Sequence, residues 1–171
     1  FPFALLCQLF FDVGINLVLN PIYCILRMYS LAIYFMMLGC NVAALFSKKI
    51  RTMMRGHRDT WRILRRHIGS DRYVWFHAAS LGEFEQGRPL MERLRREHPE
   101  KKILLTFFSP SGYEVRKNYA GADVVCYLPF DTPFNALKFV RMARPEEAYF
   151  IKYEFWRNYI EVLHRNGIPV Y

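Results

Sequence analysis

Short apolar segments alternate with amphipathic ones from residue 73 to the end of the chain. The alternation predicts strands at residues 73–78, 103–108, 124–128, 148–151 and 168–171, and helices at residues 82–98, 113–119, 132–142 and 155–165. The strand segments are apolar almost throughout, which is typical of a parallel sheet covered by helices on both faces. We therefore expect an α/β fold in which residues 69–171 form one Rossmann-like domain.

A different pattern precedes this domain. Residues 28–46 carry no charged side chain, and as a helix they would cover roughly 28 Å, close to the hydrocarbon thickness of a bilayer. Residues 47–68 follow with eight Lys or Arg against Asp59. Basic runs beside an apolar span bind acidic headgroups and stay in the cytoplasm. We expect a single membrane-anchor helix, then a basic juxtamembrane helix, although Ser30 and Gly39 leave open a helix that lies in the membrane interface.

The first part of the chain fits neither pattern well. Residues 1–27 are apolar but interrupted by Asp12 and Pro21, and they begin with Phe1, so they make a poor signal peptide. We expect them to be a non-native upstream extension, with the true start at Met28.

Charge and cysteine content argue against several classes of protein. The net charge of +9 is concentrated in the basic helix, whereas a nucleic-acid binder would carry it on the folded domain. The four cysteines form no CxxC pair, so neither a zinc site nor a disulfide framework is indicated. An anionic membrane surface is therefore the expected partner of the basic residues, and nucleic acid is not.

The segments that follow the predicted strands are the candidate site, because parallel α/β sheets bind ligands at the carboxyl ends of their strands. They read SLGE, SPSGYE, PFDTP and KYEFW. None of them matches GxGxxG or GxxxxGK[ST], which argues against dinucleotide-dependent enzymes and P-loop enzymes.

Two of these segments contain residues with two possible roles. Glu83 falls in the first turn of a predicted helix, where a carboxylate is either a cap or a general base, and Gly82 permits a tight turn before it. Ser109, Ser111 and Gly112 could offer hydroxyls and amides to a phosphate, or they could only cap a helix.

The last segment holds a carboxylate among aromatic residues. Glu154 in such a setting either forms a structural ion pair or has a functional partner. His77 and Lys152 lie beside these loops at strand ends, and each is more often a structural residue than a catalyst.

Three motifs resemble those of the 3-deoxy-D-manno-octulosonic acid (Kdo) transferases. HAASLGEFEQGRPLMERLR resembles their HA(A/S)SVGE segment, and LLTFFSPSGYEVRKNY is similar to their strand-loop-helix around a TPTG-type turn. FIKYEFWRN resembles their ETELWPN segment. The motifs occur in the same order, and the resemblance runs from about Met28 to Tyr171. The sequences of the motifs are most similar to those of the Bacteroidetes branch of the family.

The resemblance implies an N-terminal, acceptor-side domain of a GT-B glycosyltransferase that transfers Kdo from CMP-Kdo to a lipid A precursor with inversion. It implies that Glu83 is the general base and Glu154 a second catalytic glutamate. The acceptor-binding residues that it implies are Ser80, Gly82, Ser109, Ser111 and Gly112. Lys152 and Arg157 depart from the family's motif, so their roles stay open.

The resemblance also implies what surrounds the domain. Lipopolysaccharide biosynthesis places the enzyme at the bacterial inner membrane with its catalytic part on the cytoplasmic face. CMP-Kdo is the donor substrate, and no metal or cofactor is expected. The family's C-terminal donor domain would follow Tyr171, so we expect this chain to be a fragment that does not transfer Kdo alone. The alternative is a non-catalytic, membrane-tethered module that binds the acceptor.

Overall fold

The computed structural model describes residues 21–152 and 155–171, with side chains from residue 27 onward. Most of the expected upstream extension, and Glu154, lie outside the described residues. The strands are β1 (Tyr73–Ala78), β2 (Lys102–Phe107), β3 (Val124–Tyr127) and β4 (Pro145–Phe150). The described helices are α2 (Pro21–Phe46), α3 (Lys48–His67), α4 (Leu81–Glu97), α5 (Pro110–Arg116), α6 (Pro133–Ala143) and α7 (Arg157–Arg165).

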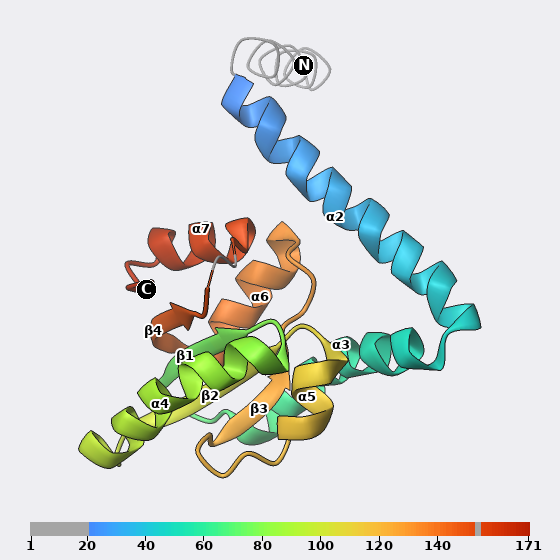
Figure 1. Ribbon diagram of the computed structural model, residues 1–171. Coiled ribbons are helices and arrows are strands. Elements are labelled where there is room, and N and C mark those ends of the chain that lie inside the picture. Colours follow the sequence, from blue (N-terminus) through green and yellow to red (C-terminus); the bar gives the residue numbers. More distant parts are fainter. Residues whose placement is uncertain (1–20, 153–154) are drawn as a thin grey trace.

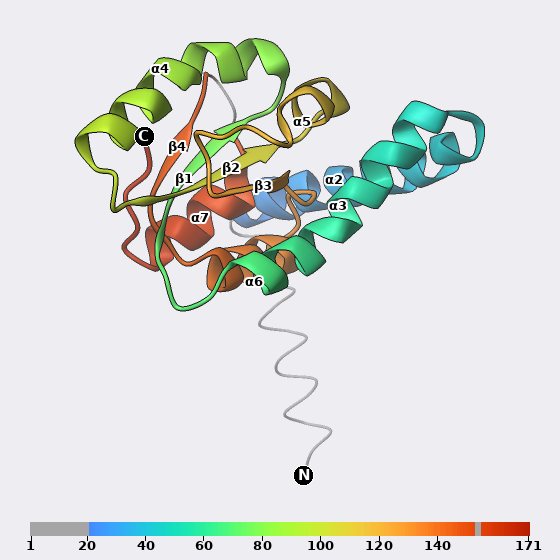
Figure 2. The same ribbon diagram turned by 90° about the horizontal axis from the view of Figure 1, so that it is seen from below.

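Helices cover both faces of a parallel four-stranded sheet (Figures 1 and 2). Side chains of α3, α6 and α7 pack on one face, against Trp75 and Leu104. Side chains of α4 and α5 pack on the other face, against Phe76 and Leu105. Successive residues of a strand point to opposite faces, so burial on both sides requires the continuous apolar character that the sequence has. The expected mixed α/β fold with a parallel sheet is confirmed.

The strand order is β3-β2-β1-β4. Beyond β4, Phe150 N donates to Tyr171 O at 2.9 Å, and the expected strand at residues 168–171 is present only as a bridge between Ala148 and Val170, because only the last residues run alongside β4. This order is that of the first half of a doubly wound sheet. Such sheets bind ligands where the order reverses, which is here between β1 and β4.

Three elements begin two or three residues away from the expected position. α5 begins at Pro110, because Ser109 accepts a hydrogen bond from Ser111 N at 3.2 Å and proline favours the first helical position. α7 begins only at Arg157, where the carboxylate of Asp131 caps its first amides. β4 begins three residues early, because its two glutamates form ion pairs with a lysine next to β2 (Lys101 with Glu146 and Glu147, at 3.1 Å and 3.3 Å).

The basic helix α3 contributes to the core of the α/β fold. Thr60 Oγ1 donates to Tyr127 O at 2.7 Å, and Leu64 is buried against the sheet. A Cβ at Gly56 would collide with the ring of Tyr127, so α3 approaches β3 closely only through a glycine. The Lys and Arg side chains of α3 are all exposed. One face of α3 therefore stabilises the domain while the other carries positive charge.

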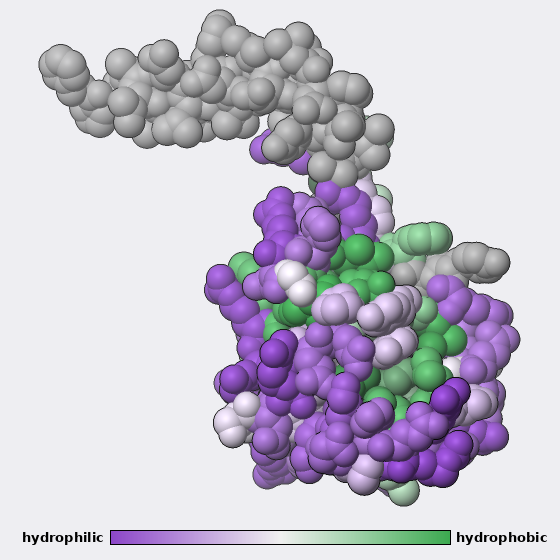
Figure 3. Space-filling view, turned by 90° about the vertical axis from the view of Figure 1, so that its left-hand side faces the viewer, coloured by the Kyte–Doolittle hydropathy of each residue, from purple (hydrophilic) through white to green (hydrophobic). Residues whose placement is uncertain are grey.

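The apolar helix α2 contrasts with the rest of the surface. Its segment Arg27–Phe46 is the one candidate membrane span among the described residues, judged by length and composition, and none of it is buried. Leu45 and Phe46 are 69% and 86% exposed. Hydrophilic side chains cover most of the face of the α/β domain in Figure 3. An apolar helix whose side chains are not buried in the core fits membrane association.

Candidate active site

Main-chain hydrogen bonds join the loops that follow the strands. Ser109 N donates to Ala79 O at 2.8 Å, and Ile151 N donates to His77 O at 2.9 Å. The loops after β2 and β4 are thereby fixed on either side of the loop after β1. The predicted segments thus meet at one edge of the sheet, at the point where its strand order reverses.

Ser80 and Glu83 open α4 directly after β1. The amide of Ser80 donates to Glu83 Oε2 at 2.8 Å, and Ser80 Oγ lies 3.2 Å from the same oxygen, to which it donates. This is a capping-box arrangement, in which a glutamate in the first turn reaches back to the residue before the helix. No hydrogen bond from a described residue reaches Oε1. One oxygen therefore fixes the half-buried carboxylate, and the other is available to a substrate hydroxyl, so the cap and base roles are compatible.

Two glycines of α4 have different surroundings. Gly82 lies inside the helix without positive φ, and a Cβ there would meet nothing within 4 Å, so the expectation that it permits a tight turn is wrong. Its role in acceptor binding stays a prediction. At Gly87, a position that the sequence reasoning missed, a Cβ would lie 2.8 Å from the side chain of Ile151. Gly87 therefore lets α4 approach the end of β4 closely.

Ser109, Ser111 and Gly112 open α5. The hydroxyls of Ser109 and Ser111 lie 2.8 Å apart and share a hydrogen bond, and Ser109 also caps the helix. Gly112 is buried, and a Cβ there would collide with the ring of Phe107. Gly112 thus has a packing reason to be glycine, while the two hydroxyls lie at the surface; their acceptor-binding roles stay a prediction.

We call Ser80, Glu83, Ser109 and Ser111 the polar edge. It offers one carboxylate and three hydroxyls at the carboxyl ends of β1 and β2. Such a set can accept a proton and hydrogen-bond a polar ligand. In the part of the chain that the structure describes, no group of three or more His, Cys, Asp or Glu side chains could hold a metal ion.

The loop after β4 begins with a strained residue. Lys152 has a φ of +66°, in the left-handed region, and its side chain is exposed. This conformation costs a residue other than glycine about 1–2 kcal/mol, and such strain recurs at functional sites. Glu154 follows two residues later, outside the described residues, so its catalytic role stays a prediction.

Five rings pack together at the carboxyl ends of the strands, and we call them the aromatic cluster: His57, His77, Phe108, Phe130 and Trp156. The centroid of Phe108 lies 5.0 Å from that of His57 and 4.8 Å from that of Trp156. Trp156 meets His77 edge to face at 5.3 Å. The rings come from α3, from β1 and from the loops after the other strands, so the cluster closes this end of the sheet with a rigid, largely apolar layer.

Both histidines of the cluster are neutral at physiological pH. Burial lowers the pKa of His57 from 6.5 to about 4, and that of His77 to about 3. His77 Nδ1 lies 2.9 Å from Thr106 Oγ1, which accepts a hydrogen bond from Trp75 Nε1 at 2.8 Å. His77 is fully buried, and its structural role stays a prediction.

Asp131 is a buried carboxylate in the PFDTP loop that the sequence reasoning did not single out. Its Oδ2 accepts from Asn158 N at 3.0 Å, and its Oδ1 accepts from Tyr159 N at 3.1 Å. Tyr29 OH of α2 donates to Oδ2 at 2.6 Å. Asp131 therefore caps α7 and ties α2 to the domain at the same point.

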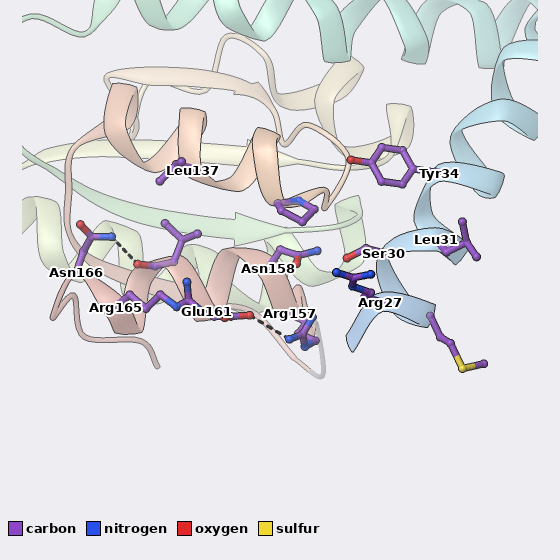
Figure 4. Close-up of a pocket in the computed structure, with 13 residues that line it drawn as sticks. Arg27, Ser30, Leu31, Tyr34, Leu137, Arg157, Asn158, Glu161, Arg165 and Asn166 are labelled. Atoms are coloured by element: carbon purple, nitrogen blue, oxygen red, sulfur yellow. Dashed lines mark hydrogen bonds and ion pairs between the residues drawn. The ribbon is translucent and has the colours of Figure 1, made fainter. Parts of the chain in front are cut away.

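A cleft of about 770 Å³ lies between α2 and the pair α6 and α7. Figure 4 shows its lining, which includes Arg27, Leu31 and Tyr34 from α2, Leu137 from α6, and Arg157, Glu161 and Arg165 from α7. Glu161 forms ion pairs with Arg157, at 3.0 Å, and with Arg165. The cleft thus combines apolar side chains with a row of charged ones.

Comparison with known proteins identifies the protein family to which this chain belongs. The family model described as 3-deoxy-D-manno-octulosonic-acid transferase (kdotransferase) matches residues 51–171, which include most of α3 and all of the α/β domain. The chain belongs to the family of Kdo transferases, which are glycosyltransferases. The resemblance read from the three motifs is confirmed.

Curated relatives carry the same name. The chain is 38% identical over 88 residues to a 3-deoxy-D-manno-octulosonic acid transferase of Aquifex aeolicus, covering 51% of this chain and 24% of the relative. It is 33% identical over 97 residues to that of Haemophilus influenzae, covering 56% of this chain and 23% of the relative. A probable mitochondrial 3-deoxy-D-manno-octulosonic acid transferase of Arabidopsis thaliana is 32% identical over 98 residues, with 57% and 22% covered. The chain spans about a quarter of the length of the curated relatives it matches.

Proposed function

We propose that this chain is the acceptor-side part of a GT-B glycosyltransferase that moves Kdo from CMP-Kdo to a lipid A precursor in lipopolysaccharide biosynthesis. Family membership supports the reaction class. The assignment of Glu83 as the base rests on one observation. Its carboxylate is held through one oxygen, at the edge of the sheet where the strand order reverses. A fixed carboxylate with a second oxygen available is what removal of a proton from a sugar hydroxyl needs.

In the proposed step, Glu83 removes the proton from the acceptor hydroxyl. The acceptor oxygen bonds to the anomeric carbon of Kdo while the bond from that carbon to the phosphate oxygen of CMP breaks, and CMP leaves with the electron pair. Attack opposite the leaving group inverts the configuration. The hydroxyls of Ser109 and Ser111 would position the acceptor beside Glu83. No metal or cofactor takes part in this step.

We place the binding of CMP-Kdo in a C-terminal Rossmann-like domain, in the part of the relatives' length that the match does not cover. Glu154 would act as the second catalytic glutamate, from the loop after β4. The apolar helix α2 and the exposed basic side chains of α3 would hold the domain at the cytoplasmic face of the bacterial inner membrane. The acceptor is a lipid, so its sugars would lie at that same surface.

The test is Glu83→Gln in the full-length gene product, assayed with CMP-Kdo and a lipid A precursor. Loss of a general base should lower the transfer rate by roughly 10²- to 10⁴-fold. The midpoint of thermal unfolding should stay near that of the wild type, because an amide oxygen can still accept the hydrogen bond from Ser80 N. Glu92→Gln, on the same helix, is the matched control and should keep full activity.

The outcomes separate the assignments. Transfer by the wild type together with an active Glu83→Gln variant would contradict the base assignment and leave the reaction class standing. No transfer by the full-length wild type would contradict the enzymatic function and favour the acceptor-binding module.

A further inference from the structure

The part of α2 from Tyr29 to Phe46 is attached to the same α/β domain on both sides. At its N-terminal end, Tyr29 OH donates to the buried carboxylate of Asp131 at 2.6 Å. At the other end, α2 passes into α3, and Met54 is already buried in the domain. Met54 follows Phe46 by eight positions, which in helical conformation is roughly 12 Å. Neither end of this segment is therefore far from the folded domain.

This attachment conflicts with a helix that crosses a bilayer. The helix rises by seventeen residue steps from Tyr29 to Phe46, which is roughly 26 Å, or about 20 Å along the membrane normal at a tilt of 40°. If Phe46 lay at the cytoplasmic boundary, Asp131 would lie about that deep in the hydrocarbon, together with the charged residues of α7. Each charged group at such a depth costs at least about 2.5–3.5 kcal/mol.

The opposite orientation fails for a similar reason. With Tyr29 at the cytoplasmic boundary, Phe46 would lie about 20–26 Å deep, so that it and the exposed cations Lys48 and Lys49 would be inside the hydrocarbon toward its far side, while α3 has to return to the core within a few turns. A helical segment whose two ends are tied to one folded domain cannot place them on opposite sides of a membrane.

We infer that α2 lies lengthwise on the surface of an anionic bilayer, with its contact to Asp131 intact, and does not span the membrane. This inference rests on the proposed membrane location and is independent of the proposed chemistry. The lipid-facing surface would consist of exposed apolar side chains of α2, which include Leu31, Phe35, Leu38 and Leu45. In this position α2 would bury these side chains to the depth of the acyl boundary, and the cations beyond its two ends would stay at the headgroups.

The charges and the neighbouring surface fit an anionic bilayer as the partner. Exposed cations stand at both ends of the apolar segment, with Arg27 at one end and Lys48 and Lys49 at the other. Phe155 is 77% exposed and lines a second pocket together with Tyr29. Phe155 would therefore reach the same lipid surface from the domain, whereas a helix that stands upright in the membrane would hold the domain away from it.

Labelling of single cysteines tests the orientation. The full-length protein is used with all its native cysteines, four of which lie in this chain, replaced by serine, and Arg27→Cys and Lys49→Cys are each treated with a membrane-impermeant maleimide. Both positions should label in inside-out inner-membrane vesicles and stay unlabelled in intact spheroplasts. Labelling of Arg27→Cys from the outside, or its protection from both sides, would overturn the inference.

A second measurement examines contact between the domain and lipid. Phe155→Cys carrying an environment-sensitive fluorophore should be quenched by nitroxide lipids in vesicles that contain anionic phospholipid. Glu100→Cys, in the loop before β2, is the matched control and should not be quenched. Absence of quenching at residue 155, while a probe at Leu38→Cys is quenched, would overturn the lengthwise arrangement. Both readouts are independent of transferase activity.

Discussion

The polar edge and the aromatic cluster meet at the same end of the sheet, yet they hold their polar groups in opposite ways. In the polar edge, Ser80 and Glu83 are partly exposed and are bonded to each other over three residues of chain. In the aromatic cluster, His77 is fully buried, and its Nε2 has no hydrogen-bond partner in the described part of the chain. The polar edge is partly solvated and held by hydrogen bonds, which suits proton transfer. The aromatic cluster is packed at the strand ends and makes the support of the polar edge rigid.

The contrast is sharpest between two carboxylates that both lie at helix starts, Glu83 and Asp131. Asp131→Ala should lower the free energy of unfolding by about 3 kcal/mol, because it removes the cap of α7 and leaves two buried amides and Tyr29 OH without their acceptor. Glu83→Ala should cost about 1 kcal/mol or less, since water can reach its partner. Urea unfolding followed by circular dichroism measures both.

A loss of similar size in the two variants would break the comparison. It would mean that Glu83 is held for stability as Asp131 is, and that its exposure is not a sign of function. Glu92→Ala on the outer surface of α4 sets the scale for an exposed carboxylate with no capping role.

The same contrast explains what the sequence predicts well. The side chains of Ser80, Glu83, Ser109 and Ser111 have their hydrogen-bond partners within three residues, so spacing alone places them at helix starts. The alternating pattern predicts the sheet because each strand is buried on both faces.

Residues with distant partners escape such reasoning. Asp131 meets Tyr29 across 102 residues and Asn158 across 27, and no local pattern shows either contact. Gly87 and Gly56 are needed because of Ile151 and Tyr127, which belong to other elements. For the apolar segment at residues 28–46, composition leaves open both a membrane span and a helix in the membrane interface, and the contact between Tyr29 and Asp131, which favours the second, is not visible in the sequence.

Acid should weaken the aromatic cluster selectively. The pKa of His57 is about 4 in the folded protein and 6.5 when solvated, so below pH 6.5 the unfolded chain binds a proton that the folded one does not. The stability that neutral His57 contributes above pH 6.5 is lost as pH falls toward 4. Between pH 7 and pH 5 this amounts to about 2 kcal/mol.

His57→Phe keeps a ring in the cluster and removes its titration. The free energy of unfolding, measured in urea from pH 7 to pH 5, should therefore fall by about 2 kcal/mol less in this variant than in the wild type. His164→Phe is the matched control, because the side chain of His164 is exposed. Parallel pH profiles for wild type and His57→Phe would show that the imidazole is protonated or hydrated inside the fold.

The smallest expected effect concerns Lys152, which brings strain to the end of β4 beside the polar edge. Lys152→Gly should raise the free energy of unfolding by up to about 1 kcal/mol, because glycine adopts a φ of +66° without the clash of a Cβ. Lys152→Ala keeps the clash, removes the charge and should leave stability unchanged. If the strain holds the loop that carries Glu154 in a productive position, Lys152→Gly should also slow Kdo transfer in the full-length enzyme while Lys152→Ala does not. Equal free energies of unfolding for the two variants would show that glycine relieves no strain at this position. The positive φ of Lys152 would then give no support to a functional role.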